Sequence, residues 1–272
     1  MTDIPQVWDW QIAEGVTPLK KGHTDVWLVD LKCDTPSQEA FRSQLSKQER
    51  KRANRFKHLG AREEYIVSRA MLRVLLASYV DVVPLALTFG QASQGKPYLI
   101  EIPRKPVPQF NMTHSHGVAL YAFSQDKVGL DLEIVSRNAN AERLAKRYFT
   151  KRESSAILDL APELQKDAFI RTWACKEACL KWTGTGLSGG LKTHEILFSD
   201  SWTDPLANGE GPQPVLTMLD PAEGWVGSLA TCEAQDVSCR VWAEEKSESD
   251  SQIDEQRTAY ASMIESHPHF NQ

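Results

Sequence analysis

No apolar run in this sequence of 272 residues reaches the roughly 18 residues that a membrane-spanning helix needs. The chain begins with MTDIPQVWDW, which carries acids where a secretory signal has basic residues and an apolar stretch. Cysteine is scarce: the five residues are an odd number, widely scattered, and do not suit a disulfide framework. From these absences we expect reduced thiols, a cytoplasmic location and no membrane partner.

The chain also lacks an excess of positive charge. Its 31 Lys and Arg and 36 Asp and Glu give a net charge of −5, so we expect neither the broad basic surface of a duplex-binding protein nor a nucleic-acid partner. The first 120 residues carry 16 bases and 12 acids, a net charge of +4, and the remainder carries −9. Residues 244–272 hold seven acids and two bases among few apolar side chains, which predicts an acidic, flexible tail.

What the sequence does contain is an order of elements that occurs twice. Each half has a short apolar strand, a capping-box helix start and a long apolar helix: residues 26–31, 46–49 and 63–80, then residues 130–135, 150–153 and 168–184. Ser46 and Thr150, which head the two capping boxes, are 104 residues apart, and the same offset places Arg73 opposite Glu177. The repeated order predicts an internal duplication.

The composition and the repeat together predict the architecture. With 41% hydrophobic residues the chain can form a sizeable core. We expect an α+β protein of two similar α/β subdomains, each a small sheet packed with helices, with a ligand cleft between them. The expected bounds are residues 1–108 and 109–243, followed by the tail. The proline-rich stretch 102–109 is expected to link the halves, and residues 124–127, SQDK, to form a hairpin turn.

Two carboxylates stand one residue apart in the apolar stretch VGLDLEIV (128–135). In a strand, Asp131 and Glu133 share a face with Gly129, while the apolar residues between them point into a core. Like charges so close repel each other unless a cation lies between them, and hard oxygen ligands of this kind suit Mg²⁺. Gly129 leaves room for a close approach on the same face. The alternative is a half-solvated strand whose acids face water.

A second set of polar residues lies in WACKEACLK (173–181). On a helix Trp173, Glu177 and Lys181 fall along one stripe. Glu177 and Lys181 could be an ordinary surface ion pair, but that reading leaves the aromatic residue unexplained. Cys175 and Cys179 lack the ligand spacing of a zinc site, so we expect them to be core residues.

Basic and polar residues that could hold a phosphate lie elsewhere. Six Lys or Arg stand between residues 47 and 57, with Arg52 and Arg55 on one helix face, although a solvated helix surface explains such a run as well. Lys96 follows a glycine in the turn GKP, where an ammonium and the backbone can meet a phosphate.

The stretch FNMTHSHG (110–117) gathers several hydrogen-bonding side chains: Asn111, Thr113, His114 and His116. The two histidines could be a metal pair, but a hydrogen-bonding scaffold is the favoured interpretation.

Together these motifs resemble the 4′-phosphopantetheinyl transferases, in particular the surfactin-synthetase-type branch with two fused similar halves. The signature of that family is a Gly-x-Asp-x-Glu strand followed by Trp-x-x-Lys-Glu-(Ala/Ser)-x-x-Lys. The matching segments, in order between residues 26 and 200, are GKP (95–97), FNMTHS (110–115), GLDLE (129–133), FTKRE (149–153) and WACKEACLK (173–181). Each motif alone is weak, but five in the family's order are specific.

The resemblance implies an enzyme that moves 4′-phosphopantetheine from coenzyme A to a serine of an apo acyl or peptidyl carrier protein, releasing 3′,5′-ADP. It also implies roles for individual residues. The implied Mg²⁺ ligands are Asp131, Glu133 and Glu177. The implied catalytic residues are Glu177, as general base, metal ligand or both, and Lys181. The implied coenzyme A contacts are Arg52, Lys96, Asn111, Thr113, His114, Asp131 and Lys181.

The sequence departs from the family pattern in two places. Thr113 stands where the family has serine, and Glu49 interrupts the basic run before Arg52. Two other functions stay open at this point: a metal-dependent nuclease, which can use the same carboxylates, and a non-catalytic binding homologue. Because one chain carries both halves, we expect a monomer.

Overall fold

The computed structural model describes residues 10–13, 15–33, 35–100, 102, 106–135, 140–186, 190–199 and 202–242. The expected acidic tail lies outside these residues. No helix in the described part is both long enough and apolar enough to span a membrane.

The described chain forms six α-helices, one 3₁₀ turn and twelve strands. The helices are α1 (Thr35–Ser43), α2 (Lys47–Ala53), α3 (Leu59–Val80), α4 (Ala141–Tyr148), α5 (Lys151–Leu158) and α6 (Pro162–Thr183), and η1 is Pro84–Ala86. The strands are β1 (Gln11–Ala13), β2 (His23–Asp30), β3 (Phe89–Gln91), β4 (Pro97–Leu99), β5 (Gln109–Ser115), β6 (Val118–Ser124), β7 (Val128–Ile134), β8 (His194–Phe198), β9 (Pro205–Gly209), β10 (Val215–Met218), β11 (Trp225–Thr231) and β12 (Asp236–Trp242).

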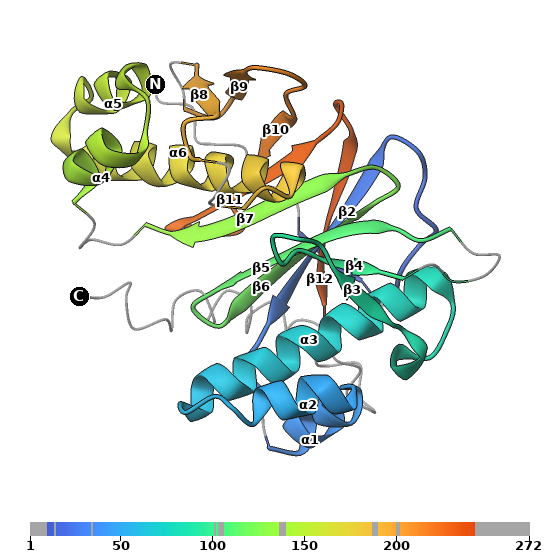
Figure 1. Ribbon diagram of the computed structural model, residues 1–272. Helices are drawn as coiled ribbons and strands as arrows, with labels where there is room; N and C mark the ends of the chain where they lie inside the picture. The colour runs from blue at the N-terminus through green and yellow to red at the C-terminus, as the bar shows by residue number, and fades with distance from the viewer. Residues whose placement is uncertain are drawn as a thin grey trace.

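Two five-stranded sheets pack against each other through one apolar core. Their strand orders are β1-β12-β2-β6-β5 and β7-β11-β10-β9-β8. Alternate residues of β2, β6, β7 and β11 meet between the sheets, Val26 and Leu130 among them. The outer face of the first sheet is covered by α3 and the outer face of the second by α6 (Figure 1). The architecture is therefore α+β, as the sequence predicted.

The two halves repeat one arrangement. In the first, β2 pairs antiparallel with β6, and in the second, β7 pairs antiparallel with β11. Both sheets have one long helix of 22 residues on the outer face, α3 or α6. Both capping boxes are present, headed by Ser46 and Thr150. The expectation of two similar subdomains is confirmed.

The sheet order divides the chain after β6 rather than at residue 108. The hairpin of β5 and β6 pairs with β2 and so completes the first sheet, although it follows the expected linker at residues 102–109. The expected hairpin at residues 124–127 is wrong, because β6 and β7 belong to different sheets. At the far end, β12 returns to the first sheet and pairs parallel with β2. Such pairings join distant segments and leave no local pattern.

In each half, a buried cation on the long helix joins that helix to the capping-box glutamate and to the segment that follows the helix. In the first half, Arg73 bonds to Glu49 of the capping box over 2.7 Å and to the carbonyl oxygens of Pro84 and Leu87. Its guanidinium thereby ties α2, α3 and the following loop together.

In the second half, Lys176 bonds to Glu153 over 2.6 Å and to the carbonyl oxygens of Leu191 and His194. Arg73 therefore corresponds to Lys176, and its expected alignment with Glu177 is wrong by one residue. The long helices begin at Leu59 and Pro162, 103 residues apart, whereas the capping boxes are 104 apart.

Candidate functional site

The acid-bearing face of β7 is turned toward helix α6. Leu130 points into the core between the sheets, whereas Gly129 and Asp131 face the helix. A Cβ at residue 129 would overlap the carbonyl oxygen of Ala178 and the backbone nitrogen of Trp182. The group that approaches Gly129 closely is therefore the backbone of α6, and β7 and α6 are in direct contact here.

The predicted stripe on α6 meets this face of β7. Lys181 donates from Nζ to Oδ1 of Asp131 over 2.5 Å and to the carbonyl oxygen of Leu130 over 2.9 Å. Trp173, eight residues earlier, acts on the carboxylate of Glu133 and lowers its pKa. The sequence placed Trp173 on the stripe but gave it no role; its partner is the second acid of the D-x-E pair.

The three carboxylates share one electrostatic environment. Burial, followed by the charge of Asp131, raises the pKa of Glu133 to about 7, against the lowering effect of Lys181 and Trp173. Burial and then Asp131 also raise the pKa of Glu177, which Lys181 partly offsets. The charge of Asp131 thus acts on both glutamates, and the charge of Glu177 also acts on Glu133, so the three acids influence one another across the contact of β7 with α6.

Asp131 has one carboxylate oxygen left over. Its Oδ1 accepts from Lys181 and, over 3.4 Å, from the hydroxyl of Thr113. Its Oδ2 is buried and has no hydrogen-bond partner among the described residues. A buried carboxylate oxygen without a partner costs free energy of folding, and a bound cation would offset that cost.

As they stand, the carboxylates are not a finished metal centre. Within the described ranges no three His, Cys, Asp or Glu side chains are arranged as a ready metal-binding group. Asp131 is held by Lys181, so a cation at its Oδ1 would have to displace this contact. Cys175 and Cys179 are both buried in the apolar core and free, which confirms the expectation that they are core residues.

Strand β5 lies beside β7, where the edges of the two sheets meet. Asn111 accepts from the backbone N–H of Leu130 over 2.9 Å, and Thr113 reaches Asp131. His114 points the other way, because successive side chains of a strand alternate, and it is exposed. The predicted contacts in β5 are thus divided, with Asn111 and Thr113 at the acids and His114 on the opposite face.

His116 belongs to the turn between β5 and β6. Its φ of 48° is left-handed, its Nδ1 lies 2.9 Å from the hydroxyl of Ser115, and its ring meets Trp225 edge-on. These contacts fit the hydrogen-bonding scaffold that the sequence favoured over a metal pair.

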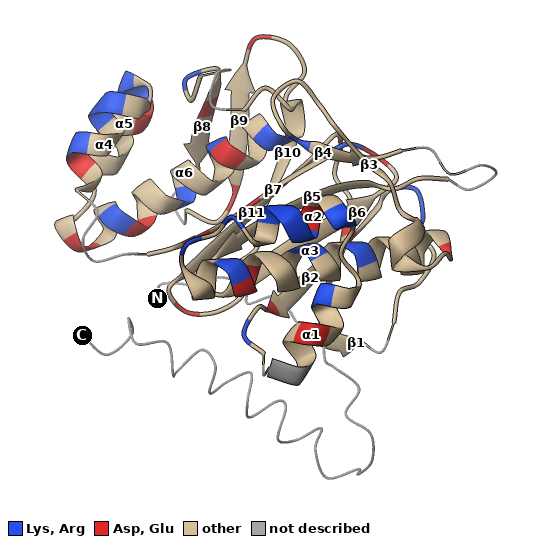
Figure 2. Cartoon of the chain, turned by 60° about the horizontal axis from the view of Figure 1, so that its bottom comes forward, with Lys and Arg blue, Asp and Glu red and all other residues tan. Residues whose placement is uncertain are grey.

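The predicted phosphate contacts from the first half lie in two places. Arg52 is exposed on α2, in the basic run that Figure 2 shows in blue, with its guanidinium 5.5 Å from the centre of the Tyr65 ring. Lys96 is partly buried in the turn between β3 and β4, and its Nζ donates to the carbonyl oxygens of Val128 and Lys181. Burial, then Lys127 and Lys181, lowers the pKa of Lys96 to about 8.

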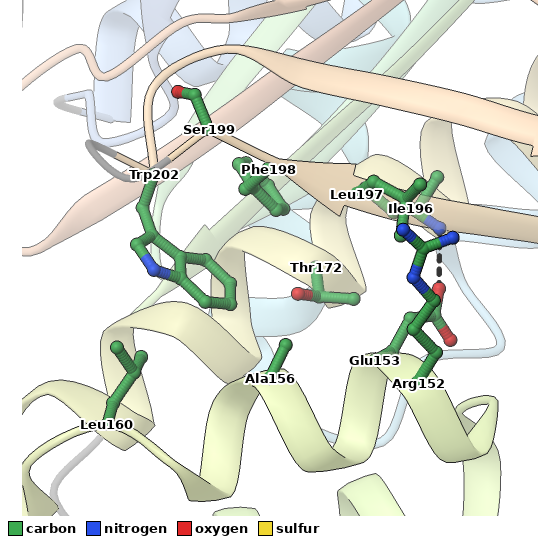
Figure 3. Close-up of a pocket in the computed structure, with 10 residues that line it drawn as sticks. All are labelled: Arg152, Glu153, Ala156, Leu160, Thr172, Ile196, Leu197, Phe198, Ser199 and Trp202. Carbon is green, nitrogen blue, oxygen red and sulfur yellow. Dashed lines mark hydrogen bonds between the residues drawn. The ribbon is translucent and has the colours of Figure 1, made fainter.

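A cavity of about 360 Å³ lies elsewhere, between α5 and β8. Figure 3 shows it walled by Leu160, Phe198 and Trp202, with Arg152 at one end and Glu153 bonded to the backbone of Ile196. None of the acids on β7 or α6 lines this cavity. Its walls are mostly apolar, so it does not offer the chemistry of the acid-bearing site.

Comparison with known proteins covers most of the described chain. Residues 127–219 match the family model described as 4′-phosphopantetheinyl transferase superfamily, and residues 34–126 match the one described as 4′-phosphopantetheinyl transferase, N-terminal. These matches divide at residue 126, as the sheets do.

Individual similar proteins are named as members of the same family. The 4′-phosphopantetheinyl transferase HetI of Nostoc is 33% identical over 75% of this chain and 86% of its own length. A Bacillus subtilis 4′-phosphopantetheinyl transferase is 28% identical over 72% of this chain and 84% of its own. Sfp of the same species is 28% identical over 58% of this chain and 68% of its own. The chain therefore belongs to the 4′-phosphopantetheinyl transferase family, in the branch with two similar halves that its motifs indicated.

Proposed function

We propose that this transferase moves 4′-phosphopantetheine from coenzyme A to a serine of an apo carrier protein at the acids of β7 and α6. The observation that carries the proposal is the convergence of Asp131, Glu133 and Glu177 from two elements, with Lys181 among them. A binding surface for a neutral ligand has no use for Asp131 beside two glutamates whose pKa values its charge raises. A site that handles a diphosphate with a cation does.

The residues present fit Mg²⁺. All three candidate ligands offer hard oxygen atoms, Oδ2 of Asp131 is buried without a partner, and the mutual repulsion of the acids would be relieved by a divalent cation. Asp131, Glu133 and Glu177 would hold the ion. When bound, Mg²⁺ supplies positive charge that offsets the charge on the diphosphate of coenzyme A.

At the same acids, Lys181 has a role toward the phosphates. Its ammonium is partly exposed and bonds to Asp131, so it can exchange this carboxylate for a phosphate oxygen when the substrate binds. Asn111 and Thr113 approach the same acids from β5. Arg52 and His114 would approach the nucleotide end of coenzyme A from the first half.

The transfer needs a base for the serine proton. The serine oxygen attacks the phosphorus next to pantetheine, the bond from that phosphorus to the bridging oxygen breaks, and 3′,5′-ADP leaves. Glu177 is the acceptor we propose, because its raised pKa makes it a stronger base than an exposed carboxylate. Whether the proton passes directly or through a water is decided by the bound substrates.

The test is incubation with coenzyme A, Mg²⁺ and separate apo carriers of fatty-acid, polyketide and peptide synthesis. Mass spectrometry should find one phosphopantetheine added to at least one carrier, and chelation of the metal should stop the reaction. Transfer that persists in excess chelator would refute the metal proposal. We further propose that the enzyme is a cytoplasmic monomer, which its free cysteines and the joining of both halves in one chain support; a solution mass of twice the chain mass would contradict the monomer.

A further inference from the structure

Lys96 joins three elements of the site through one ammonium group. It stands in the turn between β3 and β4, which belongs to the first half. Its Nζ donates to the carbonyl oxygen of Val128 over 2.8 Å and to that of Lys181 over 2.7 Å. Val128 begins β7 and Lys181 is in the last turn of α6, so one side chain ties the first half to both elements that carry the acids.

The bond to Lys181 has a clear physical reason. The last four carbonyl groups of a helix have no partner within it, and they form the negative end of the helix dipole. A cation placed there satisfies a carbonyl and is favoured by the dipole. Lys96 thus caps α6 from another part of the fold, beside the C-cap Gly184.

The two bonds fix the backbone from which the reactive side chains extend. Lys181 reaches Asp131 with its ammonium while its own carbonyl is held by Lys96. Val128 is followed directly by Gly129, where β7 touches α6. Loss of the Lys96 ammonium would leave two carbonyls unsatisfied at this contact and release the end of α6 that carries Lys181.

We propose that Lys96 is a positioning residue, which fixes β7 and the end of α6 so that Lys181 stays aligned with Asp131. This differs from the phosphate contact that the family resemblance implies for Lys96. The inference rests on the proposed function of Lys181 and Asp131, and it concerns how their geometry is maintained.

The two roles predict different kinetics for Lys96→Met. A positioning residue changes the rate of the bound complex, so kcat should fall about 10- to 100-fold, while KM for coenzyme A and the inhibition constant of 3′,5′-ADP change less than about twofold. A phosphate contact predicts the reverse, with both constants raised and kcat nearly kept; that result would overturn the proposal, as would unchanged kinetics. Lys127→Met is the matched control, because Lys127 lies near Lys96 but contacts the Trp182 ring, and it should leave all three constants unchanged.

A double substitution separates positioning from a general loosening of the fold. If Lys96 acts through Lys181, then Lys96→Met should lower kcat little further in a Lys181→Met background. Multiplying effects would show that Lys96 acts independently and would contradict the proposal. Full activity of Lys181→Met alone would instead refute the proposed site, and the two failures are therefore distinguishable.

Discussion

Arg73 and Lys176 are equivalent residues that perform the same task in the two halves. Each is a buried cation on the long helix, bonded to the capping-box glutamate and to two carbonyl oxygens of the loop that follows the helix. Both halves have therefore kept the ion pair between the long helix and the capping box. Only the second half has the acids of the proposed site.

In the first half, the positions equivalent to the two acids of β7 hold apolar residues. On β2, Trp27 corresponds to Asp131 and Val29 to Glu133 by the offset of 104. Both are buried against α3, and Trp27 donates to the hydroxyl of Tyr79. Trp27 and Val29 thus take the positions of Asp131 and Glu133, while the buried acid on this face of β2, Asp25, accepts hydrogen bonds from Tyr79 and Arg240.

Lys176→Met should destabilise the second half. The substitution leaves the carboxylate of Glu153 buried without its cation, and breaking a buried pair in this way costs about 3–5 kcal/mol. Urea denaturation measures the loss, and Arg73→Met should give a smaller loss, because Arg69 still bonds to Glu49. For Lys176→Met, a loss below about 1 kcal/mol would show that the ion pair of Lys176 with Glu153 contributes little to stability.

Glu49→Gln should reduce the loss of stability in acid. Burial acts to raise the pKa of Glu49, but hydrogen bonds from Arg73 and the Ser46 backbone, with the charges of Arg73 and Arg69, lower it below its ordinary value. A lowered pKa means that the carboxylate stabilises the fold fully above the pKa of the unfolded chain and loses this contribution as pH falls through the folded value.

Wild-type stability should therefore drop more steeply than that of the variant as the pH falls below about 4.5. The free energies of unfolding of the two proteins should converge at the lowest pH. Parallel pH profiles from neutral to acid would contradict the assignment.

Glu133→Gln should stabilise the metal-free protein while it abolishes transfer. Since the pKa of Glu133 is raised to about 7, its ionised form opposes folding, fully so at pH 8. Removing that charge should increase stability by roughly 1 kcal/mol, and the melting temperature by about 2–4 °C. Thermal melts at pH 8 measure this. Added Mg²⁺ should raise the melting temperature of wild type only, and an equal rise in the variant would remove Glu133 from the metal site.

Gly129→Ala should separate β7 from α6. The added methyl group would overlap the backbone of Ala178 and Trp182, which cannot move without shifting the helix. We expect a loss of about 1–3 kcal/mol by denaturation, together with lower transfer activity. Gly60→Ala is the control, because residue 60 lies in α3 with open space around it, and alanine there should be neutral or slightly stabilising.

The local features of the structure could be predicted from the sequence. The alternation in β7, the stripe on α6 and the two capping boxes follow from periods of two and 3.6 residues, and the structure has all of them. The return of β12 to the first sheet and the pairing of β6 with β2 depend on contacts between distant segments. The partners of Lys96 are backbone carbonyls, which leave no trace in the side-chain pattern, so its bonds could not be anticipated.

The measurement that tests the central claim most directly is the rate of phosphopantetheine transfer by Asp131→Ala and Glu177→Gln, followed by the mass of one apo carrier. Both variants should keep a folded structure by circular dichroism and lose transfer, because the charges they remove are needed when the diphosphate is broken. If either variant modifies the carrier at a rate near that of wild type, the acids of β7 and α6 are not where the reaction takes place.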